Sequence, residues 1–434
     1  MVFKIGLLGL GTVGIGTAKI LLSPQGRHPL IHELEIYRVG VRDISKTRDV
    51  NISPNILTTD LEAIATDPDV DIIIELIGGL EPARSLILKA IEHGKHIVTA
   101  NKAVISRYGQ EIFDAANKKS VYVMLEAAVG GGIPVIQPLK ESLGVNRIHS
   151  ITGIVNGTTN YILTRMEKEG ADFADVLADA QSLGYAEADP TADVEGLDAK
   201  DKIAILGSLA FGSIIKLEDI YCEGISQITA ADITYAAQLD FVIKLLAIAK
   251  GSPNSTNSTS DKLQLRVHPT LIPKTHPLAS INDVYNAILI EGEPIGQVMF
   301  FGPGAGAGPT ASAVVSDIMS IAAILQTKTE PIPHPLLSCT HQKSCEIEPI
   351  KELITRFYTR FLTQDKPGVI GKLGSCFGKY NVSLESVVQT GIHNQLAEIV
   401  VVTHDVREGN FRQALGEIQS LDIIDSIPSI LRVL

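Results

Sequence analysis

The first fourteen residues constrain the fold more than any other stretch of the chain. Residues 3–9 (FKIGLLG) have the pattern of a buried strand, and Gly9, Gly11 and Gly14 complete a GxGxxG motif at its end. An apolar helical pattern continues to Leu22. Between a strand and a helix, such glycines permit a tight turn and leave the free N–H groups of the helix N-terminus facing a pyrophosphate. The opening therefore predicts a dinucleotide-binding turn, with a glycine-rich turn of no function as the alternative.

Strands and helices alternate after this motif. The further expected strands are 33–41, 70–78, 95–100 and 120–126, and the expected helices are 82–93 and 103–118. This alternation predicts an α/β fold, with a doubly wound parallel sheet of the Rossmann type over residues 1–126. Cofactor loops of such sheets follow the carboxyl ends of the strands, which indicates Gly78, Thr99 and Lys102 as contacts.

The end of the second expected strand indicates which dinucleotide binds. Arg42 stands where a 2′-phosphate needs a cation, and Lys46 and Arg48 follow closely. Asp43 could instead accept a hydrogen bond from the ribose 2′-hydroxyl of NAD. We therefore expect NADP as the cofactor with NAD as a possible one, and a solvated cluster of charges is the alternative interpretation.

Composition and charge exclude several classes of protein. A chain of 434 residues is too long for one typical domain. The net charge of −12 argues against a nucleic-acid partner. No window approaches 18 uninterrupted apolar residues, so we expect no membrane span, and the glycines of the opening argue against a signal peptide. The four cysteines form no CxxC pattern, which is typical of unpaired thiols in the cytoplasm.

Acidic residues crowd the segment 184–206 (GYAEADPTADVEGLDAKDKIAIL), which ends in an apolar helical run. Asp198 and Lys202 are four residues apart and so share one face of a helix. Carboxylates can hold the ammonium group of a ligand, and a positioned lysine can stabilise an oxygen that becomes an alkoxide and can also deliver the proton. The alternative for this acid and lysine is a surface ion pair.

Five separated motifs together resemble those of homoserine dehydrogenases over essentially the whole chain. They are TANKAVIS (99–106), EAAVGGGIPVI (126–136), GIVNGTTNYIL (153–163), the acidic segment 184–206, and GPGAGAGPTASAV (302–314). In the third motif, Asn156 and Thr158 are candidate capping or ligand residues. The resemblance implies an NAD(P)H-dependent reduction of L-aspartate 4-semialdehyde to L-homoserine, which serves threonine, methionine and isoleucine biosynthesis. It also implies an α+β catalytic and dimerisation domain over 127–304, a helix at 305–326 that returns to the Rossmann domain, and a homodimer or homotetramer.

The resemblance also implies roles for individual residues. The catalytic residues would be Lys202, Asp198 and Lys102. The substrate would contact Glu187, Asp193, Tyr185, Thr158 and Gly157, although some relatives carry paired aspartates where this chain has Ala192 and Asp193. The cofactor would contact Gly9, Gly11, Thr12, Val13, Gly14, Arg42, Gly78, Thr99, Lys102 and Gly306. A sodium ion would be held, largely through backbone oxygens, at Glu126, Val129, Gly131 and Ile133, where an ordinary glycine turn is the alternative.

The last hundred residues predict a further module. Residues 327–350 have the composition of a linker, and their histidines and cysteines fit no zinc pattern. The order strand–helix–strand–strand–helix–strand over 351–434, with a DKPG turn, resembles an ACT domain. That resemblance implies feedback regulation by an amino acid such as threonine, bound near Asp365, Gly368 and Asn381. A dimerisation module without a ligand is the alternative.

Two other functions stay open at this level. Another dehydrogenase with an ACT domain, such as phosphoglycerate dehydrogenase, would need a catalytic histidine with an acid partner and a dinucleotide motif deep in the chain. Here the motif opens the chain instead. A non-catalytic amino-acid sensor would be expected to lose a lysine or an acid of the site, yet Lys102, Glu187, Asp198 and Lys202 are all present.

Overall fold

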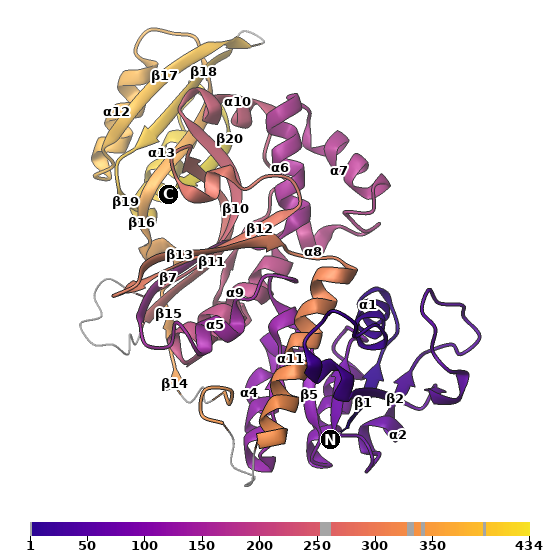
Figure 1. The fold of residues 1–434 in the computed structure, drawn as a ribbon. Helices are drawn as coiled ribbons and strands as arrows, with labels where there is room; N and C mark the ends of the chain where they lie inside the picture. The colour runs from indigo at the N-terminus through magenta and orange to yellow at the C-terminus, as the bar shows by residue number, and fades with distance from the viewer. Residues whose placement is uncertain (1, 252–261, 328–333, 340–342, 394–395) are drawn as a thin grey trace. The chain divides into compact units, whose positions relative to one another are not determined.

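The computed structural model describes residues 2–251, 262–327, 334–339, 343–393 and 396–434 (Figure 1). Parts of the expected linker, 328–333 and 340–342, lie outside the described residues. The chain divides into two compact units. Unit 1 holds Met1–Ile151, Asp201–Leu217 and Asn286–Cys345, and unit 2 holds Thr152–Lys200, Glu218–Tyr285 and Glu346–Leu434. The domain boundaries expected from the sequence stay a prediction.

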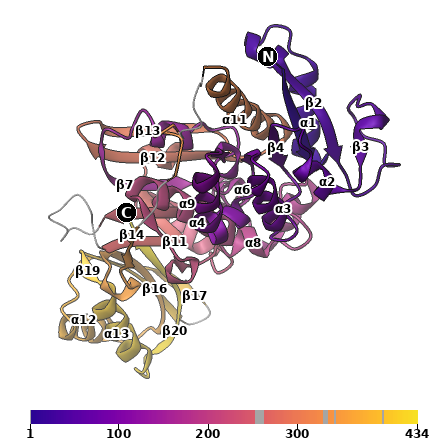
Figure 2. The ribbon, with the colours of Figure 1, turned by 90° about the horizontal axis from the view of Figure 1, so that it is seen from below.

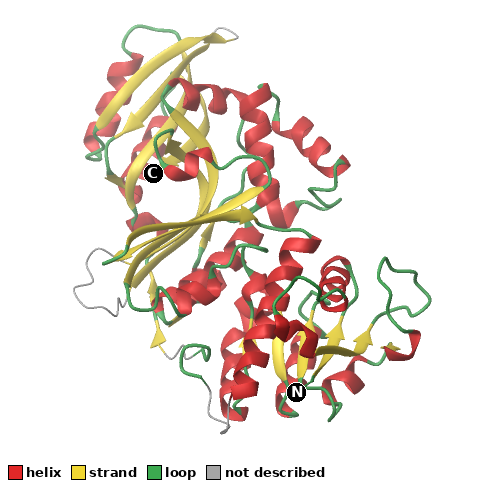
Figure 3. Ribbon diagram, viewed as in Figure 1, coloured by secondary structure: helices red, strands yellow, loops and turns green. Residues whose placement is uncertain are grey.

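Unit 1 contains a six-stranded sheet in the order β3-β2-β1-β4-β5-β6. Its strands are β1 (Phe3–Leu8), β2 (Leu34–Gly40), β3 (Leu57–Thr58), β4 (Ile72–Glu75), β5 (His96–Thr99) and β6 (Val123–Met124). All five pairings are parallel. The chain first builds outward from β1 on one side and then on the other, so the predicted doubly wound Rossmann sheet is confirmed. Figure 3 shows its short strands flanked by helices.

The helices of unit 1 include one long apolar helix, α11, that belongs to its core. They are α1 (Thr12–Leu22), α2 (Leu61–Thr66), α3 (Ala83–Glu92), α4 (Lys102–Lys119), α5 (Ile136–Lys140) and α11 (Ala307–Thr327). Helix α11 packs on α1, where a Cβ on Gly16 would lie only 2.7 Å from the carbonyl oxygen of Ala307. Among the described residues it is the one helix long and apolar enough to cross a membrane, but half of the relevant window is buried. Such burial is typical of a core helix.

The remaining strands of unit 1 belong to two sheets. Strand β12 (Tyr285–Glu293) has β13 (Gly296–Pro303) on one side and β7 (Arg147–Ile154) on the other. Strands β8 (Ser213–Ile214) and β14 (Lys343–Ser344) form a separate parallel pair. Helix α9 (Leu197–Phe211) contributes its first residues to unit 2 and its remainder to unit 1.

Unit 2 is built on a long antiparallel hairpin, β10 (Phe241–Gly251) and β11 (Lys262–Pro273). Its helices are α6 (Gly157–Glu169), α7 (Phe173–Ser182), α8 (Thr191–Val194) and α10 (Ala230–Gln238). The two-residue strands β9 (Tyr221–Cys222) and β15 (Glu346–Ile347) pair with β11 in parallel. Strand β11 therefore has beside it two segments, β9 and β15, that are far apart in the sequence.

The C-terminal part of unit 2 has the predicted strand–helix order of an ACT domain. Its elements are β16 (Ile354–Gln364), α12 (Val369–Lys379), β17 (Leu384–His393), β18 (Leu396–Thr403), α13 (Glu408–Gln419) and β20 (Ile424–Val433). The strand order is β20-β16-β18-β17, and the three neighbouring pairs are antiparallel. Helices α12 and α13 lie side by side (Figure 2) and cover an aromatic core in which the rings of Phe357 and Phe411 stack at 4.0 Å. The predicted fold class is therefore confirmed in all three parts.

The ACT sheet does not stand apart from the rest of unit 2. Strand β20 pairs in parallel with β11 through Thr270 with Arg432 and Leu271 with Val433. The β10–β11 hairpin and the ACT strands thus share one hydrogen-bonded sheet. A separate sensor joined only by a linker would not have this pairing.

Candidate active site

The β1–α1 turn has the conformation that its glycines suggest. Gly9 has a φ of +104°, which side chains rarely allow, and a Cβ on Gly14 would lie 2.2 Å from the carbonyl oxygen of Gly9. Gly11 precedes α1, and a Cβ there would meet nothing within 4 Å. Open space therefore lies beside the helix N-terminus, where the exposed Thr12 begins the helix. This geometry fits a pyrophosphate.

A buried acid connects the next two cofactor loops. The carboxylate of Glu75 accepts hydrogen bonds from the N–H groups of Ile77 (2.9 Å) and Gly78 (3.1 Å) and from the hydroxyl of Thr99 (2.7 Å). The Thr99 hydroxyl oxygen in turn accepts from the N–H of Asn101 (3.0 Å). Glu75 is fully buried, and it holds the loops after β4 and β5 together. Sequence analysis missed this residue, and its only signal was an acid at the end of an apolar strand.

The two candidate catalytic lysines lie on helices that contact each other in unit 1. Lys102 is the first residue of α4, and Lys202 is a buried residue of α9. The carboxylate of Asp201, next to Lys202, accepts hydrogen bonds from the hydroxyl of Ser106 (3.0 Å) and the guanidinium of Arg107 (2.9 Å). Ser106 is one helical turn from Lys102, so this contact brings the two lysine-bearing turns near each other.

In unit 2, one amide positions two candidate acids. Asn156 is the N-cap of α6 and accepts a hydrogen bond from the N–H of Thr159 (2.8 Å). Its side-chain nitrogen donates to Asp193 (2.7 Å) and to Asp198 (2.9 Å). The structure therefore brings Asp193 and Asp198 together, next to Gly157, the first residue of the helix. Asn156 was a candidate capping or ligand residue. It caps α6, and its side-chain amide also fixes the positions of the two acids.

The other candidate substrate contacts of unit 2 lie at a more exposed position. The hydroxyl of Thr158 donates to the carbonyl oxygen of Tyr185 (2.7 Å), and the rings of Tyr185 and Tyr161 are 4.9 Å apart. The carboxylate of Glu187 is exposed and makes no hydrogen bond or ion pair with any residue that the structure describes. Its backbone oxygen is held by Gln181 at 3.1 Å. The carboxylate is therefore available to a ligand.

Asp198 and Lys202 do not form an exposed surface pair. Both side chains lie one turn apart on α9, and the two residues are only 8% and 9% exposed. The alternative of a solvated ion pair is therefore wrong. Charged groups at this depth need positioned partners.

The glycine turn after β6 contains three buried residues whose carbonyl oxygens accept no backbone hydrogen bond from the described residues. The carboxylate of Glu126 accepts from the N–H groups at the start of α5 (2.6–2.7 Å), so its side chain acts as a helix cap. Within the described residues, no hydrogen bond reaches the carbonyl oxygens of Val129, Gly131 and Ile133, which are all buried. Buried carbonyl oxygens of this kind suit a hard cation. The described residues contain no group of three or more His, Cys, Asp or Glu side chains that could hold a metal ion.

A second glycine loop covers this turn. A Cβ on Gly131 would lie 2.5 Å from the carbonyl oxygen of Gly304, and the N–H of Gly132 donates to the carbonyl oxygen of Pro303 (3.2 Å). Gly306, with a φ of +119°, leads from this loop into α11. The two glycine loops can approach closely only because they lack side chains.

A buried acid pair lies behind the glycine turn. The backbone N–H of Glu126 donates to the carboxylate of Asp317 (2.8 Å), whose second oxygen is buried without a partner in the described chain. Burial and the neighbouring charge of Glu126 raise the pKa of Asp317 well above its usual value. Burial also raises the pKa of Glu126, against the effect of its three backbone hydrogen bonds.

The loop after β2 leaves two of its three candidate cations, Arg42 and Lys46, exposed. The carboxylate of Asp43 accepts from the N–H (2.8 Å) and hydroxyl (2.6 Å) of Ser45, and these hydrogen bonds lower its pKa. Arg48 donates to the backbone oxygens of Asp43 and Lys46, both at 2.8 Å. Arg42 is exposed, and its side chain forms no hydrogen bond with any residue that the structure describes. Of the three cations, only Arg48 therefore has its guanidinium engaged by backbone oxygens of the loop.

The three candidate effector residues do not lie together. Asp365 and Gly368 precede α12, and Gly368 has a φ of +91°. Asn381 follows the other end of the same helix, with a φ of +57°. At 1.5 Å per residue, α12 separates Gly368 from Asn381 by about 20 Å. One small amino acid cannot contact both ends.

Comparison with known proteins agrees with this geometry. Residues 9–126 match the profile of the homoserine dehydrogenase NAD-binding domain, residues 134–319 that of homoserine dehydrogenase, and residues 357–422 that of the ACT domain. The homoserine dehydrogenase of Synechocystis sp. is 65% identical over 435 residues, covering 100% of both chains.

Solved structures give the same assignment. A homoserine dehydrogenase from Thiobacillus denitrificans superposes with a TM-score of 0.92 at 40% identity, covering 100% of this chain and 98% of that one. A hyperthermophilic archaeal homoserine dehydrogenase in complex with NADPH has a TM-score of 0.61 at 26% identity, covering 76% of this chain and 99% of that one. With its nicotinamide-dinucleotide domain, its catalytic domain and its ACT domain, the chain belongs to the homoserine dehydrogenase family of oxidoreductases.

Proposed function

We propose that the chain reduces L-aspartate 4-semialdehyde to L-homoserine, with hydride supplied by a bound reduced nicotinamide. The observation that carries this proposal is the pair of carboxylates held by Asn156, one of which lies a single turn before Lys202 on α9. An amino-acid aldehyde needs an anion for its ammonium group and a cation near its carbonyl oxygen. This segment offers both charges.

The roles of the side chains follow from this chemistry. Glu187 and Asp193 would bind the substrate ammonium group. The carbonyl oxygen gains negative charge as hydride arrives, and the ammonium groups of Lys102 and Lys202 would stabilise that charge. Lys202 would then give the oxygen its proton, which completes the alcohol. Asp198 would orient Lys202 from one helical turn away.

NADPH is the cofactor that the β2 loop favours. Arg42 has its guanidinium exposed at the end of β2, where it could pair with a 2′-phosphate. The carboxylate of Asp43 is already engaged by Ser45, which weakens the case for a contact with the ribose hydroxyl of NAD. The complex of the archaeal relative with NADPH supports the same choice.

A sodium ion is proposed at the glycine turn. The buried carbonyl oxygens of Val129, Gly131 and Ile133 have no backbone donor in the described residues, and a monovalent cation would satisfy them. The backbone oxygen of Glu126 would complete the set, while its carboxylate stays on the N-terminus of α5. The ion would then fix the turn that packs on Gly304.

Regulation and assembly complete the proposal. The ACT domain would bind threonine near Asp365 and Gly368, at the exposed N-terminus of α12. We assign no role there to Asn381, which lies at the far end of that helix. We further propose a homodimer or homotetramer in the cytoplasm, where threonine, methionine and isoleucine are made.

The test is the loss of NADPH absorbance when L-aspartate 4-semialdehyde is added. Lys202→Ala should lower kcat by at least about a hundredfold, because it removes a charge stabiliser and proton donor. The affinity for NADPH should stay unchanged. The matched control is Lys200→Ala, which removes a lysine two residues away on the same helix. Near-normal turnover by folded Lys202→Ala enzyme would remove Lys202 from the mechanism.

A further inference from the structure

Glu75 is a fully buried acid whose partners in the described residues are neutral donors. It ends β4, and in the register of the sheet it lies between Leu8 of β1 and Thr99 of β5. Burying a carboxylate without a cation is costly, and apolar side chains could join these strands at a lower cost. We therefore expect the acid to fix a particular conformation of the neighbouring loops rather than to add stability.

The hydrogen bonds around Glu75 all run in one direction. The N–H groups of Ile77 (2.9 Å) and Gly78 (3.1 Å) donate to one carboxylate oxygen, Oε1. The hydroxyl of Thr99 donates to the other oxygen, Oε2 (2.7 Å), while its own oxygen accepts from the N–H of Asn101 (3.0 Å). Position 75 therefore needs two acceptor oxygens and no donor, which a glutamate provides and a glutamine does not.

Asn101 connects this network to the start of α4. Its side-chain oxygen accepts from the N–H of Val104 (3.3 Å) as the N-cap of the helix, and its side-chain nitrogen donates to the carbonyl oxygen of Gly79 (2.7 Å). Lys102 is the next residue of the chain and the first of the helix. Through Asn101, the loop after β4 therefore fixes the turn from which Lys102 extends.

The β1–α1 turn contacts the same loop. A Cβ on Gly9 would lie 2.8 Å from the carbonyl oxygen of Leu76, and the N–H of Leu76 donates to the carbonyl oxygen of Leu8 (2.8 Å). Gly78 and Gly79 both have a φ of +72°, a backbone conformation that side chains rarely adopt. In the sheet order β2-β1-β4-β5, a dinucleotide with its 2′-phosphate at β2 and its pyrophosphate at α1 would extend toward β4 and β5. The network of Glu75 therefore lies at the nicotinamide end of the proposed cofactor.

We infer that Glu75, Thr99 and Asn101 are positioning residues, which hold Lys102 at the nicotinamide end of the cofactor. The hydroxyl of Thr99 donates to Glu75, so a contact of Thr99 with the cofactor would use its backbone. Hydride transfer needs the ammonium group of Lys102 and the nicotinamide in one geometry, and a displacement of about 1 Å can lower the rate on the order of a hundredfold. This role of Lys102 rests on the proposed function.

Glu75→Gln tests the direction of the network. The amide oxygen can keep the hydrogen bonds from the N–H groups of Ile77 and Gly78, whereas the amide nitrogen replaces the oxygen to which Thr99 donates. The loop after β4 should therefore keep its place, while the start of α4 loses its fixed position. With NADPH and L-aspartate 4-semialdehyde, kcat should fall about 10- to 100-fold. The Kd for NADPH, measured by fluorescence titration, should change less than about threefold.

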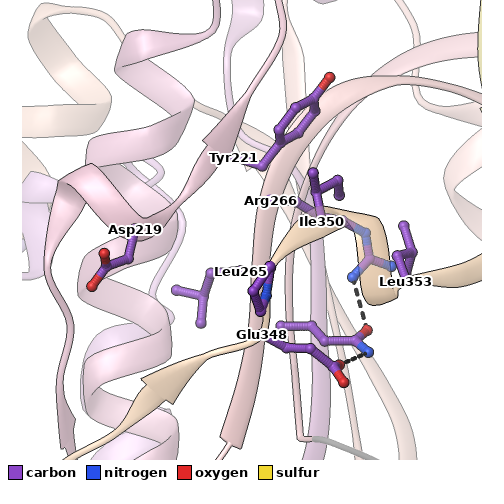
Figure 4. A pocket seen from close by; sticks show the side chains of 9 residues that line it. Asp219, Tyr221, Leu265, Arg266, Glu348, Ile350 and Leu353 are labelled. Atoms are coloured by element: carbon purple, nitrogen blue, oxygen red, sulfur yellow. Dashed lines mark hydrogen bonds between the residues drawn. The ribbon is translucent and has the colours of Figure 1, made fainter. Parts of the chain in front are cut away.

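The matched control is Glu348→Gln, the same change at an acid of unit 2. Figure 4 shows Glu348 at a small cavity that Asp219 and Arg266 also line, and its carboxylate accepts a hydrogen bond from the amide of Gln264. Whatever its effect on Tm, this control should leave kcat of the folded enzyme within about twofold of the wild type. A fall in kcat that Glu75→Gln and Glu348→Gln share would indicate a general loss of stability and would overturn the inference.

Two substitutions of Thr99 test the same contact from the other side. Thr99→Val keeps the shape of the side chain but leaves Oε2 of Glu75 and the N–H of Asn101 without their partner, whereas Thr99→Ser keeps the hydroxyl. Thr99→Val should lower kcat with little change in the Kd for NADPH, and Thr99→Ser should keep kcat within about twofold of the wild type. This pair decides the question if Glu75→Gln does not fold. Equal kcat values for the pair would refute the role of the hydroxyl, and a loss of NADPH affinity as large as the loss of kcat would refute the role of Lys102.

Hydrogen exchange separates this inference from the proposed function. In Thr99→Val the N–H of Asn101 loses its acceptor, so its exchange with solvent should be about tenfold faster or more than in the wild type, and Thr99→Ser should show no such change. Unchanged exchange in Thr99→Val would overturn the inference even in an active enzyme. An enzyme inactive on L-aspartate 4-semialdehyde would refute the proposed function, while the exchange rates would still decide whether the network fixes the start of α4.

Discussion

Replacing Asn156 with aspartate tests the centre of the candidate site. The aspartate keeps the size of the side chain and an oxygen that can cap α6, as Asn156 does through the N–H of Thr159. It removes the amide nitrogen that donates to Asp193 and Asp198, at 2.7 and 2.9 Å. It also places a third carboxylate against those two.

The size of the effect follows from these contacts. Each lost hydrogen bond to a charged group costs about 1.5–3 kcal/mol, and Asn156 is only 5% exposed, so water cannot readily replace it. If one substrate contact of Asp193 or Asp198 is lost as a result, kcat/KM should fall about 10- to 150-fold. The binding constant for NADPH should not change, because no proposed cofactor contact involves Asn156.

The pH dependence of this variant has a definite sign. Two neighbouring carboxylates and burial both raise the pKa of an aspartic acid at position 156. Below that pKa the new side chain is protonated and can donate again, so the deficit relative to wild type should shrink as the pH falls. Thermal unfolding and kcat/KM should both follow this course.

The control substitution is Asn51→Asp, the same change at an exposed position. It should leave kcat/KM and the pH profile as in the wild type. The reasoning is refuted if Asn156→Asp keeps kcat/KM within about twofold of wild type at neutral pH. It is equally refuted if NADPH binding weakens as much as substrate binding.

Three further predictions concern the cofactor, the ACT seam and the buried acid pair. Arg42→Ala should raise the KM for NADPH about tenfold and leave that for NADH nearly unchanged; equal losses would indicate a structural arginine. Arg360→Met should lower the free energy of unfolding by about 3–5 kcal/mol, because it strands two buried carboxylates, whereas the more exposed Arg412→Met should cost less in the same denaturant titration. Asp317 holds its proton to higher pH in the folded than in the unfolded chain, so it lowers stability progressively as pH rises from its unfolded pKa through its folded one. Asp317→Asn should flatten that decline in a Tm series against pH, and an unchanged slope would show that Asp317 is charged in the folded protein.

The sequence predicted the parts of the fold that depend on local pattern. The glycines of the β1–α1 turn and the apolar strands around them have a periodicity and composition that permit few alternatives. The strand and helix order of the ACT domain could be predicted for the same reason. The two-residue strand β3 was missed, because a segment that short has no pattern to detect.

Partners far apart in the sequence could not be predicted in this way. Glu75 is an acid at the end of an apolar strand, and its role appears only when Thr99 lies beside it. Asn156 could be recognised as a cap from its position, but its bonds to Asp193 and Asp198 span 37 and 42 residues. Placing Asn381 with Asp365 failed because the intervening helix α12 was not counted as a spacer.

The place of the ACT domain changes how regulation by an amino acid should be pictured. Buried arginines of its sheet pair with acids outside it: Arg360 with Asp232 of α10 at 2.9 Å, and Arg432 with Glu223 at 2.9 Å. Together with the β20–β11 pairing, these contacts place the ACT strands in the same compact unit as the acidic segment. An effector acts only through different affinities for two states of the protein. The ACT strands are bonded to β11 and to Glu223, and the neighbours of Glu223, Ile225 and Cys222, donate hydrogen bonds to the backbone oxygens of Val194 and Glu195. We therefore expect a shift of the ACT strands to disturb the segment that carries Asp193, so an effector should change substrate affinity before it changes cofactor affinity.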